Sequence, residues 1–432
     1  MRCILIILDG LGDRGQDCFE GKTPLEAAYT PNLDYLASLG INGLYHTTMQ
    51  GIPMSSETAH FVIFGYELED FPGRGYLEAK GKGVDLTDKD VAVLCHLCCV
   101  ENREGNLMLT WGRPDLSYED IRELQKAIES FETDGIRIRL FPSRGIEAFL
   151  ILSGSVTDRI TDSDPVYEGR PVMEITPLMQ KKISASSRRT ASALNKYLVH
   201  SYQTLSAHRI NRDRVSHDLT PVNAVVSQRA GKKRQLMPFR DRWGLKGLSI
   251  SSGAIYWGLC SELGIETVKV EDTGNTEEDF RYRLRFAKDA HHYDFIHVHT
   301  KMPDEAGHAK NPRYKKEVIE ALDRAMSVVV NEMIPDRETL VIVTADHSTA
   351  SSGTMIHTGE TVPITMVGKH VRNDKVREFN EIACSGGALG VVRGRELMHL
   401  VLNFLDRAKL CGLMDTPVDQ PYYPGNYRPL KL

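Results

Sequence analysis

The chain has 432 residues, which is enough for about three average domains or for one large α/β body with an insertion. Hydrophobic residues make up 41% of it and charged residues 26%, a balance that excludes disordered, collagen-like and coiled-coil proteins. The 53 Lys and Arg against 58 Asp and Glu give a net charge of −5, which argues against attraction of the whole surface to nucleic acid or anionic lipid.

The N-terminal apolar run at residues 3–8 is too short for a signal-peptide core or a membrane span. No later stretch approaches 18 uninterrupted apolar residues, and eight cysteines are too few for a disulfide scaffold. We therefore expect a cytoplasmic chain with reduced cysteines and with neither a membrane nor a nucleic-acid partner. The oligomeric state stays open.

Apolar runs alternate with amphipathic stretches at both ends of the sequence, which is typical of an α/β fold with a mainly parallel sheet. Residues 4–8 predict a buried strand, and residues 31–39 predict a helix that ends at Gly40. In the second half, helices are predicted at 254–263 and 314–333, and strands at 267–270, 295–298 and 339–344.

The middle of the chain has a different pattern, with short strands separated by polar turns. Strands are predicted at 91–100, 136–141 and 148–152, a polar linker at 184–189, and a helix at 191–203. We expect a smaller α+β domain, residues 83–240, inserted into a discontinuous core. That core comprises residues 1–82 and 241–432.

Aspartate and histidine residues gather where the predicted strands end. Asp304 and His308 stand four residues apart, so on a helical turn they share a face and can converge on one metal ion. Asp346 and His347 follow the strand at 339–344, where open α/β sheets place ligands. Singly, each segment is more typical of ordinary structural residues, but together they supply the ligands that two divalent ions need for phosphate chemistry. These residues are Asp9, Asp304, His308, Asp346, His347 and His357.

Ser56 is the candidate nucleophile because a helix-forming run follows it. At a helix N-terminus the free amides favour an incoming phosphate, and coordination to a divalent ion lowers the pKa of a hydroxyl. The alternative is an ordinary N-cap serine.

Several segments, in this order and spacing, resemble the alkaline phosphatase superfamily. Within it they resemble the cofactor-independent phosphoglycerate mutases of the archaeal type, which need no 2,3-bisphosphoglycerate. The resemblance covers nearly the whole chain. Its segments are Leu8-Asp9-Gly10, residues 21–28, residues 30–34, residues 304–308 and Thr344-Ala345-Asp346-His347.

The resemblance implies an alkaline-phosphatase-like core, with a mainly parallel sheet between helices, and two divalent metal ions. One ion would be held by Asp9, Ser56, Asp346 and His347, with Ser56 becoming phosphorylated, and the other by Asp304, His308 and His357. Lys301 matches a lysine that the family keeps near the phosphate. Because the ligands are Asp and His, the metal stays open among manganese, zinc, cobalt and magnesium.

The inserted region also resembles the family. Residues 162–165 match its Asp-x-Asp-Pro motif, which makes Asp164 a candidate general acid and base, or else a turn residue before Pro165. Arg144, Asn223 and Arg229 match residues that bind substrate, where guanidinium groups suit a carboxylate and a phosphate.

Two segments depart from the family. Residues 54–57 are Met-Ser-Ser-Glu instead of Pro-Gly-Ser-Asp, and residues 109–113 keep only Gly-Arg of an arginine-rich stretch. A zinc site at Cys95, His96 and Cys98 is a weak alternative, because an alternating strand accounts for the cysteines as core residues.

The leading hypothesis is a mutase that interconverts 2- and 3-phosphoglycerate, with the insert closing over the substrate to keep water out. The alternative is a metal-dependent phosphatase or phosphomutase of the same superfamily that acts on another small phosphate ester. A non-catalytic metal-binding or anion-binding protein is a third hypothesis.

Overall fold

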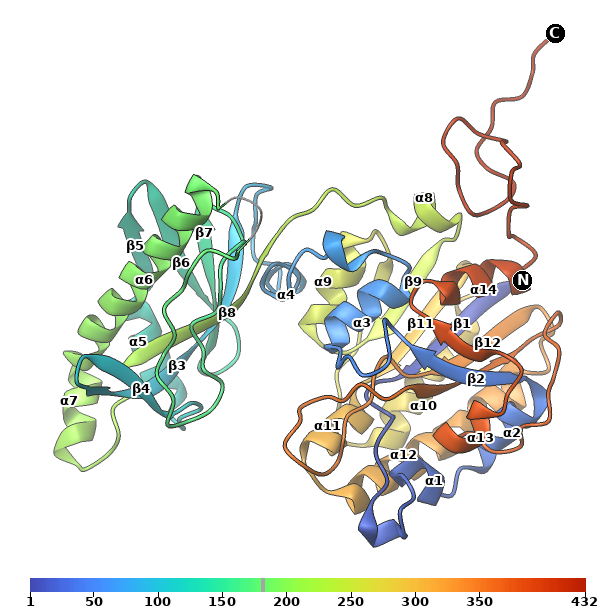
Figure 1. The fold of residues 1–432 in the computed structure, drawn as a ribbon, viewed down its shortest axis with the longest axis horizontal. Coiled ribbons are helices and arrows are strands. Elements are labelled where there is room, and N and C mark those ends of the chain that lie inside the picture. The colour runs from blue at the N-terminus through green and yellow to red at the C-terminus, as the bar shows by residue number, and fades with distance from the viewer. Residues whose placement is uncertain (180–182) are drawn as a thin grey trace. The chain divides into compact units, whose positions relative to one another are not determined.

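The computed structural model describes residues 1–179 and 183–432, and the chain divides into two compact units (Figure 1). The first unit comprises Met1–Phe71 and Leu236–Leu432, and the second comprises Pro72–Gln235. Helix α4 (Arg74–Gly81) therefore belongs to the second unit, although we expected the insert to begin at residue 83. The reason is close packing, because a Cβ at Gly75 would lie 2.4 Å from the carbonyl oxygen of Ala92 in β3.

The described residues of the first unit form an eight-stranded sheet in the order β10-β9-β11-β1-β12-β13-β2-β14. The strands from β10 to β12 are all parallel, whereas β13 is antiparallel to both of its neighbours. The predicted α/β core with a mainly parallel sheet is thus confirmed. The bounds are β1 (Arg2–Leu8), β2 (Ile41–His46), β9 (Gly247–Ser251), β10 (Glu266–Lys269), β11 (Phe295–Thr300), β12 (Thr339–Thr344), β13 (Val362–Val367) and β14 (Gly390–Arg393).

Helices cover both faces of this sheet (Figure 1). On one face α3 packs against α9, and on the other α12 packs against α2 and α10. The predicted helix at 314–333 is α12 continued by a π turn at Val329–Met333. The helices are α1 (Pro24–Ala27), α2 (Pro31–Leu39), α3 (Ser56–Ile63), α8 (Phe239–Trp243), α9 (Ala254–Glu262), α10 (Thr276–Asp289), α11 (Met302–His308), α12 (Pro312–Val328), α13 (Glu381–Ser385) and α14 (Glu396–Phe404).

The second unit contains a six-stranded antiparallel sheet in its described part, with β3 at its centre. The predicted linker at 184–189 is wrong, because Ser184 caps α6 by accepting a hydrogen bond from the backbone N–H of Ser187, so the helix begins there. The elements are β3 (Val91–Arg103), β4 (Asn106–Trp111), α5 (Tyr118–Ala127), β5 (Ser130–Thr133), β6 (Ile136–Pro142), β7 (Glu147–Ser153), α6 (Ala185–Ser206), α7 (Arg209–Ser216) and β8 (Ala224–Lys232).

The cysteines of β3 alternate between two cores. Cys95 and Cys99 pack in one hydrophobic cluster, and Cys98 packs in another with Val100 and Leu109. Because Cys95 and Cys98 face opposite sides of the strand, they do not converge on one ion, and the interpretation as core residues is confirmed. Among the described helices, none has the length and apolar character needed to span a membrane.

Candidate metal centre

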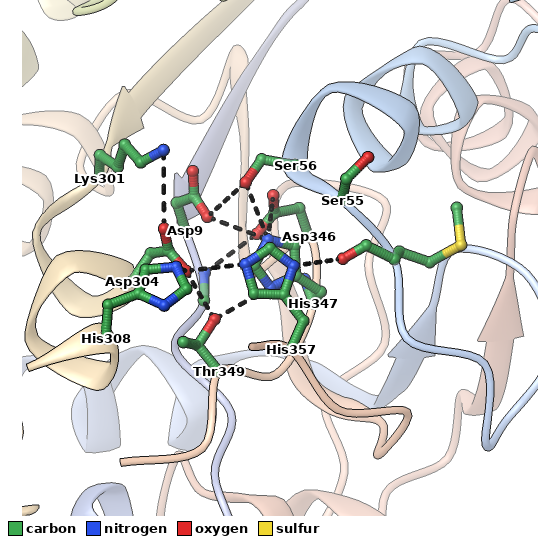
Figure 2. A network of polar contacts seen from close by, with 12 residues as sticks. Asp9, Ser55, Ser56, Lys301, Asp304, His308, Asp346, His347, Thr349 and His357 are labelled. Atoms are coloured by element: carbon green, nitrogen blue, oxygen red, sulfur yellow. Dashed lines mark hydrogen bonds and ion pairs between the residues drawn. The ribbon is translucent and has the colours of Figure 1, made fainter. Parts of the chain in front are cut away.

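The candidate ligands lie at the carboxyl ends of neighbouring parallel strands (Figure 2). Asp9 directly follows β1, Asp346 and His347 follow β12, and Asp304 lies in α11, directly after β11. Because β11, β1 and β12 are parallel neighbours, their carboxyl ends share one edge of the sheet. Residues that are far apart in the sequence are therefore brought together at this edge.

One group of ligand atoms surrounds Ser56. Asp9, Asp346 and His347 each offer an atom, and these atoms lie within 4.8 Å of one another. The Oγ of Ser56 lies 3.0 Å from Nε2 of His347 and 3.4 Å from Oδ1 of Asp9. Ser56 is the first residue of α3, and Ser55 occupies the N-cap position, so Ser56 is not an ordinary N-cap serine.

A second group shares His347 with the first. Ligand atoms of Asp304, His347 and His357 also lie within 4.8 Å of one another, and the rings of His347 and His357 stack with centroids 4.0 Å apart. The Nε2 of His308 lies 3.2 Å from Oδ1 of Asp304, and its side chain is 38% exposed. The Nζ of Lys301 lies 3.6 Å from the other oxygen of Asp304 (Figure 2). The structure thus brings together all seven predicted ligands and Lys301.

Burial and neighbouring charges shift the pKa values of the candidate ligands in different directions. Burial raises the pKa of Asp9 well above its usual range, and the charges of Asp346 and Asp304 raise it further. Burial would also raise the pKa of Asp304, but hydrogen bonds with His308 and His357 outweigh this effect and lower it. Burial lowers the pKa of His347 to about 4, so its ring is neutral at pH 7 and can ligate a metal.

Two buried carboxylate oxygens support a fit to divalent ions. Oδ2 of Asp304 lies 3.6 Å from Nζ of Lys301, and Oδ2 of Asp346 lies 3.4 Å from Nδ1 of His60. Neither oxygen has a well-formed hydrogen bond within the described ranges. A buried carboxylate oxygen without a well-formed hydrogen bond costs free energy, and coordination of a cation offsets that cost. Oxygen and imidazole donors are the ligands that manganese, zinc and cobalt accept.

Sequence reasoning missed the residues that orient Asp9 by contacting the oxygen that faces away from Ser56. Tyr256 donates a hydrogen bond to Oδ2 of Asp9 at 2.6 Å, and Nε2 of His299 lies 3.0 Å from the same oxygen. These contacts leave Oδ1 of Asp9 facing Ser56 and His347. The available signal was His299 itself, which directly follows the predicted strand at 295–298, because a buried histidine needs a polar partner.

The second unit has a cavity of its own, of about 200 Å³, and Arg229 lies in its wall. The other predicted substrate residues lie outside that wall. Arg144 is exposed in the turn between β6 and β7, and Asn223 is bonded through both ends of its amide to the backbone of Val100. Asp164 accepts a hydrogen bond from the backbone N–H of Val166 at 2.8 Å. Polar residues of the wall that we did not predict as substrate-binding are Arg74, Glu78, His96, Arg113, Ser143, Glu147 and Gln228.

Comparison with known proteins places this geometry in a family. A model described as the metalloenzyme superfamily matches residues 1–404. A 2,3-bisphosphoglycerate-independent phosphoglycerate mutase from Methanocaldococcus jannaschii is 41% identical over 423 residues, covering 96% of this chain and 95% of the relative.

Two solved structures are similar over almost the whole chain. The PH0037 protein from Pyrococcus horikoshii has a TM-score of 0.76 and 27% identity, covering 95% of this chain and 99% of that one. A cofactor-independent phosphoglycerate mutase from Thermoplasma acidophilum has a TM-score of 0.63 and 30% identity, covering 94% and 99%. The chain therefore belongs to the metalloenzyme superfamily and, within it, to the family of 2,3-bisphosphoglycerate-independent phosphoglycerate mutases.

Proposed function

We propose that this chain interconverts 2-phosphoglycerate and 3-phosphoglycerate through a phosphoserine at Ser56, without 2,3-bisphosphoglycerate as a cofactor. The observation that carries the proposal is the position of Ser56. Its hydroxyl lies within 3.4 Å of two candidate metal ligands and at the N-terminus of α3, where backbone amides favour an incoming phosphate. The family relationship supports the same activity.

We assign two divalent ions to the site, in the ligand sets that the family resemblance implies. Asp9, Ser56, Asp346 and His347 would hold one, and Asp304, His308 and His357 the other. His347 lies within reach of both groups. When bound, the ions supply positive charge that lowers the pKa of the serine hydroxyl and offsets charge on the transferring phosphoryl group.

The residues of this chain then have separate tasks. Ser56 Oγ releases its proton to solvent and attacks phosphorus, so the Oγ–P bond forms while the bond between phosphorus and the substrate oxygen breaks. The departing oxygen needs a proton, for which Asp164 is the proposed donor and, on return, the acceptor. Lys301 is proposed to place its ammonium group beside the phosphoryl oxygens, since its Nζ lies 3.6 Å from Asp304.

We propose that the inserted domain predicted at residues 83–240 binds the glycerate part of the substrate and excludes water. Arg144, Asn223 and Arg229 are the proposed binding residues. The position of Arg229 in the wall of a cavity supports its role, because a guanidinium group can bind a carboxylate in two hydrogen bonds.

A different substrate is the second candidate. Arg113, the arginine that survives in the altered segment, is paired with Glu147 at 2.9 Å, and Thr110 donates a hydrogen bond to the carbonyl of Cys99. Both side chains are therefore engaged inside the second unit. If Arg113 stays paired with Glu147 when the substrate binds, the chain would instead be a phosphatase or phosphomutase that acts on another small phosphorylated compound in the cytoplasm.

The test is to incubate the manganese-loaded protein with 3-phosphoglycerate and to follow 2-phosphoglycerate and inorganic phosphate together. We expect 2-phosphoglycerate without free phosphate, and a loss of at least about 10⁴-fold in kcat for Ser56→Ala, because the covalent step is removed. Ser55→Ala is the matched control, since Ser55 is the neighbouring hydroxyl and contacts Thr58. Release of phosphate from simple esters without isomerisation would instead support the second candidate.

A further inference from the structure

Lys315 is a fully buried lysine that lies next to the metal centre without touching a ligand. It lies in the first turn of α12, and its Nζ donates hydrogen bonds to the carbonyl oxygens of Gly10 and Gly12, both at 2.9 Å. It also donates to the carbonyl oxygen of Thr349 at 2.7 Å and lies 3.1 Å from Oδ2 of Asp13. One ammonium group therefore joins the loop after β1 to the loop after β12.

Both of these loops carry candidate ligands. Gly10 follows Asp9, and its N–H donates a hydrogen bond to Oδ1 of Asp346 at 3.1 Å. Thr349 follows His347 by two residues, and its hydroxyl donates to Oδ1 of Asp304 at 2.7 Å (Figure 2). The same hydroxyl lies 3.2 Å from Nδ1 of His347. Lys315 thus contacts Gly10 and Thr349, and each of these residues contacts a candidate ligand directly.

The loops are also packed without spare room. Gly10 has φ of +65°, and a Cβ at this position would lie 2.5 Å from Oγ1 of Thr349 and 2.8 Å from Cα of Asp304. A Cβ at Gly12 would lie 2.1 Å from Oγ of Ser348. Because the backbones are in contact, a displacement of one loop moves the ligands of the other.

A buried ammonium group costs free energy that an apolar side chain of the same length would not. Asp13 offsets part of this cost, and Asp13 in turn accepts hydrogen bonds from the backbone N–H of Ser351. The three carbonyl partners of Lys315 all lie in ligand-bearing loops. The free-energy cost of burying the ammonium group is therefore accepted at the place where the ligands are positioned.

We propose that Lys315 is a positioning residue that fixes the two ligand-bearing loops and thereby sets the affinity of both metal ions. This inference rests on the proposed two-metal function. Residues that orient metal ligands from outside the coordination shell typically change metal affinity by about 10–100-fold when they are replaced. We expect a loss of this size for both ions in Lys315→Met, which keeps the length of the side chain and removes the ammonium group.

The test is calorimetric titration of Mn²⁺ into the metal-free full-length protein, together with the melting temperature before and after loading. Lys316→Met is the matched control, because Lys316 is the next residue of α12 and pairs with Glu320 at 2.5 Å. We expect the control to keep its Kd within about 2-fold, while Lys315→Met weakens binding about 10–100-fold and loses most of the metal-induced rise in melting temperature.

A purely structural lysine gives a different result. In that case the metal-free and loaded forms of Lys315→Met lose the same number of degrees and Kd is unchanged, which overturns the proposal. If Lys315→Met does not fold, Lys315→Met combined with Asp13→Asn avoids leaving the carboxylate of Asp13 buried and unpaired. Wild-type Kd in the folded double variant also overturns the proposal.

These results separate the inference from the proposed function. Metal titration needs no substrate, so a wild-type protein that binds Mn²⁺ but does not isomerise phosphoglycerate contradicts the function alone. An active wild-type enzyme with unchanged Kd in folded Lys315→Met contradicts the positioning role alone.

Discussion

The candidate metal centre of the first unit and the cavity of the second unit use charged residues in opposite ways. In the first unit Asp9, Asp346 and His347 are buried and face one another across strand ends, so like charges are held together at one place. In the second unit charged residues pair locally instead, as Arg113 does with Glu147 and as Arg74 does with Glu78 at 3.0 Å. The first arrangement calls for a cation, whereas the second is already neutralised.

This difference indicates which interactions can be replaced at a small cost in free energy. A surface ion pair contributes only about 0–1 kcal/mol, so an incoming anion can replace Glu147 beside Arg113 at little cost. Separating buried carboxylates from a metal ion costs far more, because they would be left without compensation. In the proposed function, the metal ligands are therefore held by the buried strand ends of the first unit, while recognition of the substrate would depend on exchangeable ion pairs in the second.

Replacement of Asp304 should give the largest loss on the metal side of this comparison. Asp304→Asn removes the charge that His308 and His357 contact at 3.2 and 3.4 Å, so one ion loses its carboxylate ligand. We expect kcat to fall by at least about 10²–10³-fold and one metal equivalent to be lost. Steady-state kinetics and metal analysis of the purified protein measure both effects.

The matched control is Glu305→Gln, which removes the neighbouring, exposed carboxylate on the same helix. It should retain both metal equivalents. If Asp304→Asn also retains both, then Asp304 is not a ligand and the ion lies elsewhere.

On the substrate side, the two candidate arginines should differ. Arg229 lies in the wall of the cavity, whereas Arg144 is exposed in a turn, so Arg229→Met should raise KM for phosphoglycerate more than Arg144→Met. We expect about a 10–100-fold rise for Arg229→Met, the equivalent of a charge-assisted hydrogen bond of about 1.5–3 kcal/mol. Equal effects of the two changes would show that the cavity does not bind the substrate.

Much of the metal centre could be predicted from the sequence because its ligands follow directly after strands. Parallel strands end at one edge of a sheet, so Asp9, Asp346 and His347 meet as soon as the strands are recognised. Helix α2 was predicted with its observed bounds because Pro31 begins it and Gly40 follows its last residue. The residue types at the ends of strands and helices are sufficient to predict these features.

The orienting residues could not be predicted because they depend on packing between distant elements. Tyr256 comes from α9 and Lys315 from α12, and neither stands in a motif. Their roles follow only from contacts with Asp9 and with the loop carbonyls. Ser184 was expected in a linker because its segment is polar, although in the structure it caps α6. Polar composition alone does not separate a loop from a capped helix.

The affinity of the first unit for metal ions should rise with pH, because its ligands include a buried carboxylate. Burial raises the pKa of Asp9 in the metal-free protein, as do Asp346 and Asp304, so a proton competes with the ion. The raised pKa stabilises the metal-free fold at low pH, and this contribution is lost as pH rises through it. The gap between the melting temperatures with Mn²⁺ and with a chelator should therefore widen as pH rises. A gap that is independent of pH contradicts this prediction.

Glu381 lies beside the ligand loops and contacts no candidate ligand, and its replacement should change the pH dependence of stability. It accepts hydrogen bonds from the hydroxyl of Thr23 and the backbone N–H of Asp13, and burial raises its pKa to about 7. The free energy of unfolding should therefore fall as pH rises from about 4.3, the value of an unfolded glutamate, towards 7. Glu381→Gln mimics the protonated form, so it should remove up to about 3 kcal/mol of this fall. Urea unfolding of the metal-free protein at pH 5 and pH 8 measures the difference. If both proteins lose the same free energy between these pH values, then another group carries the dependence, and the environment of Glu381 is more polar than its contacts indicate.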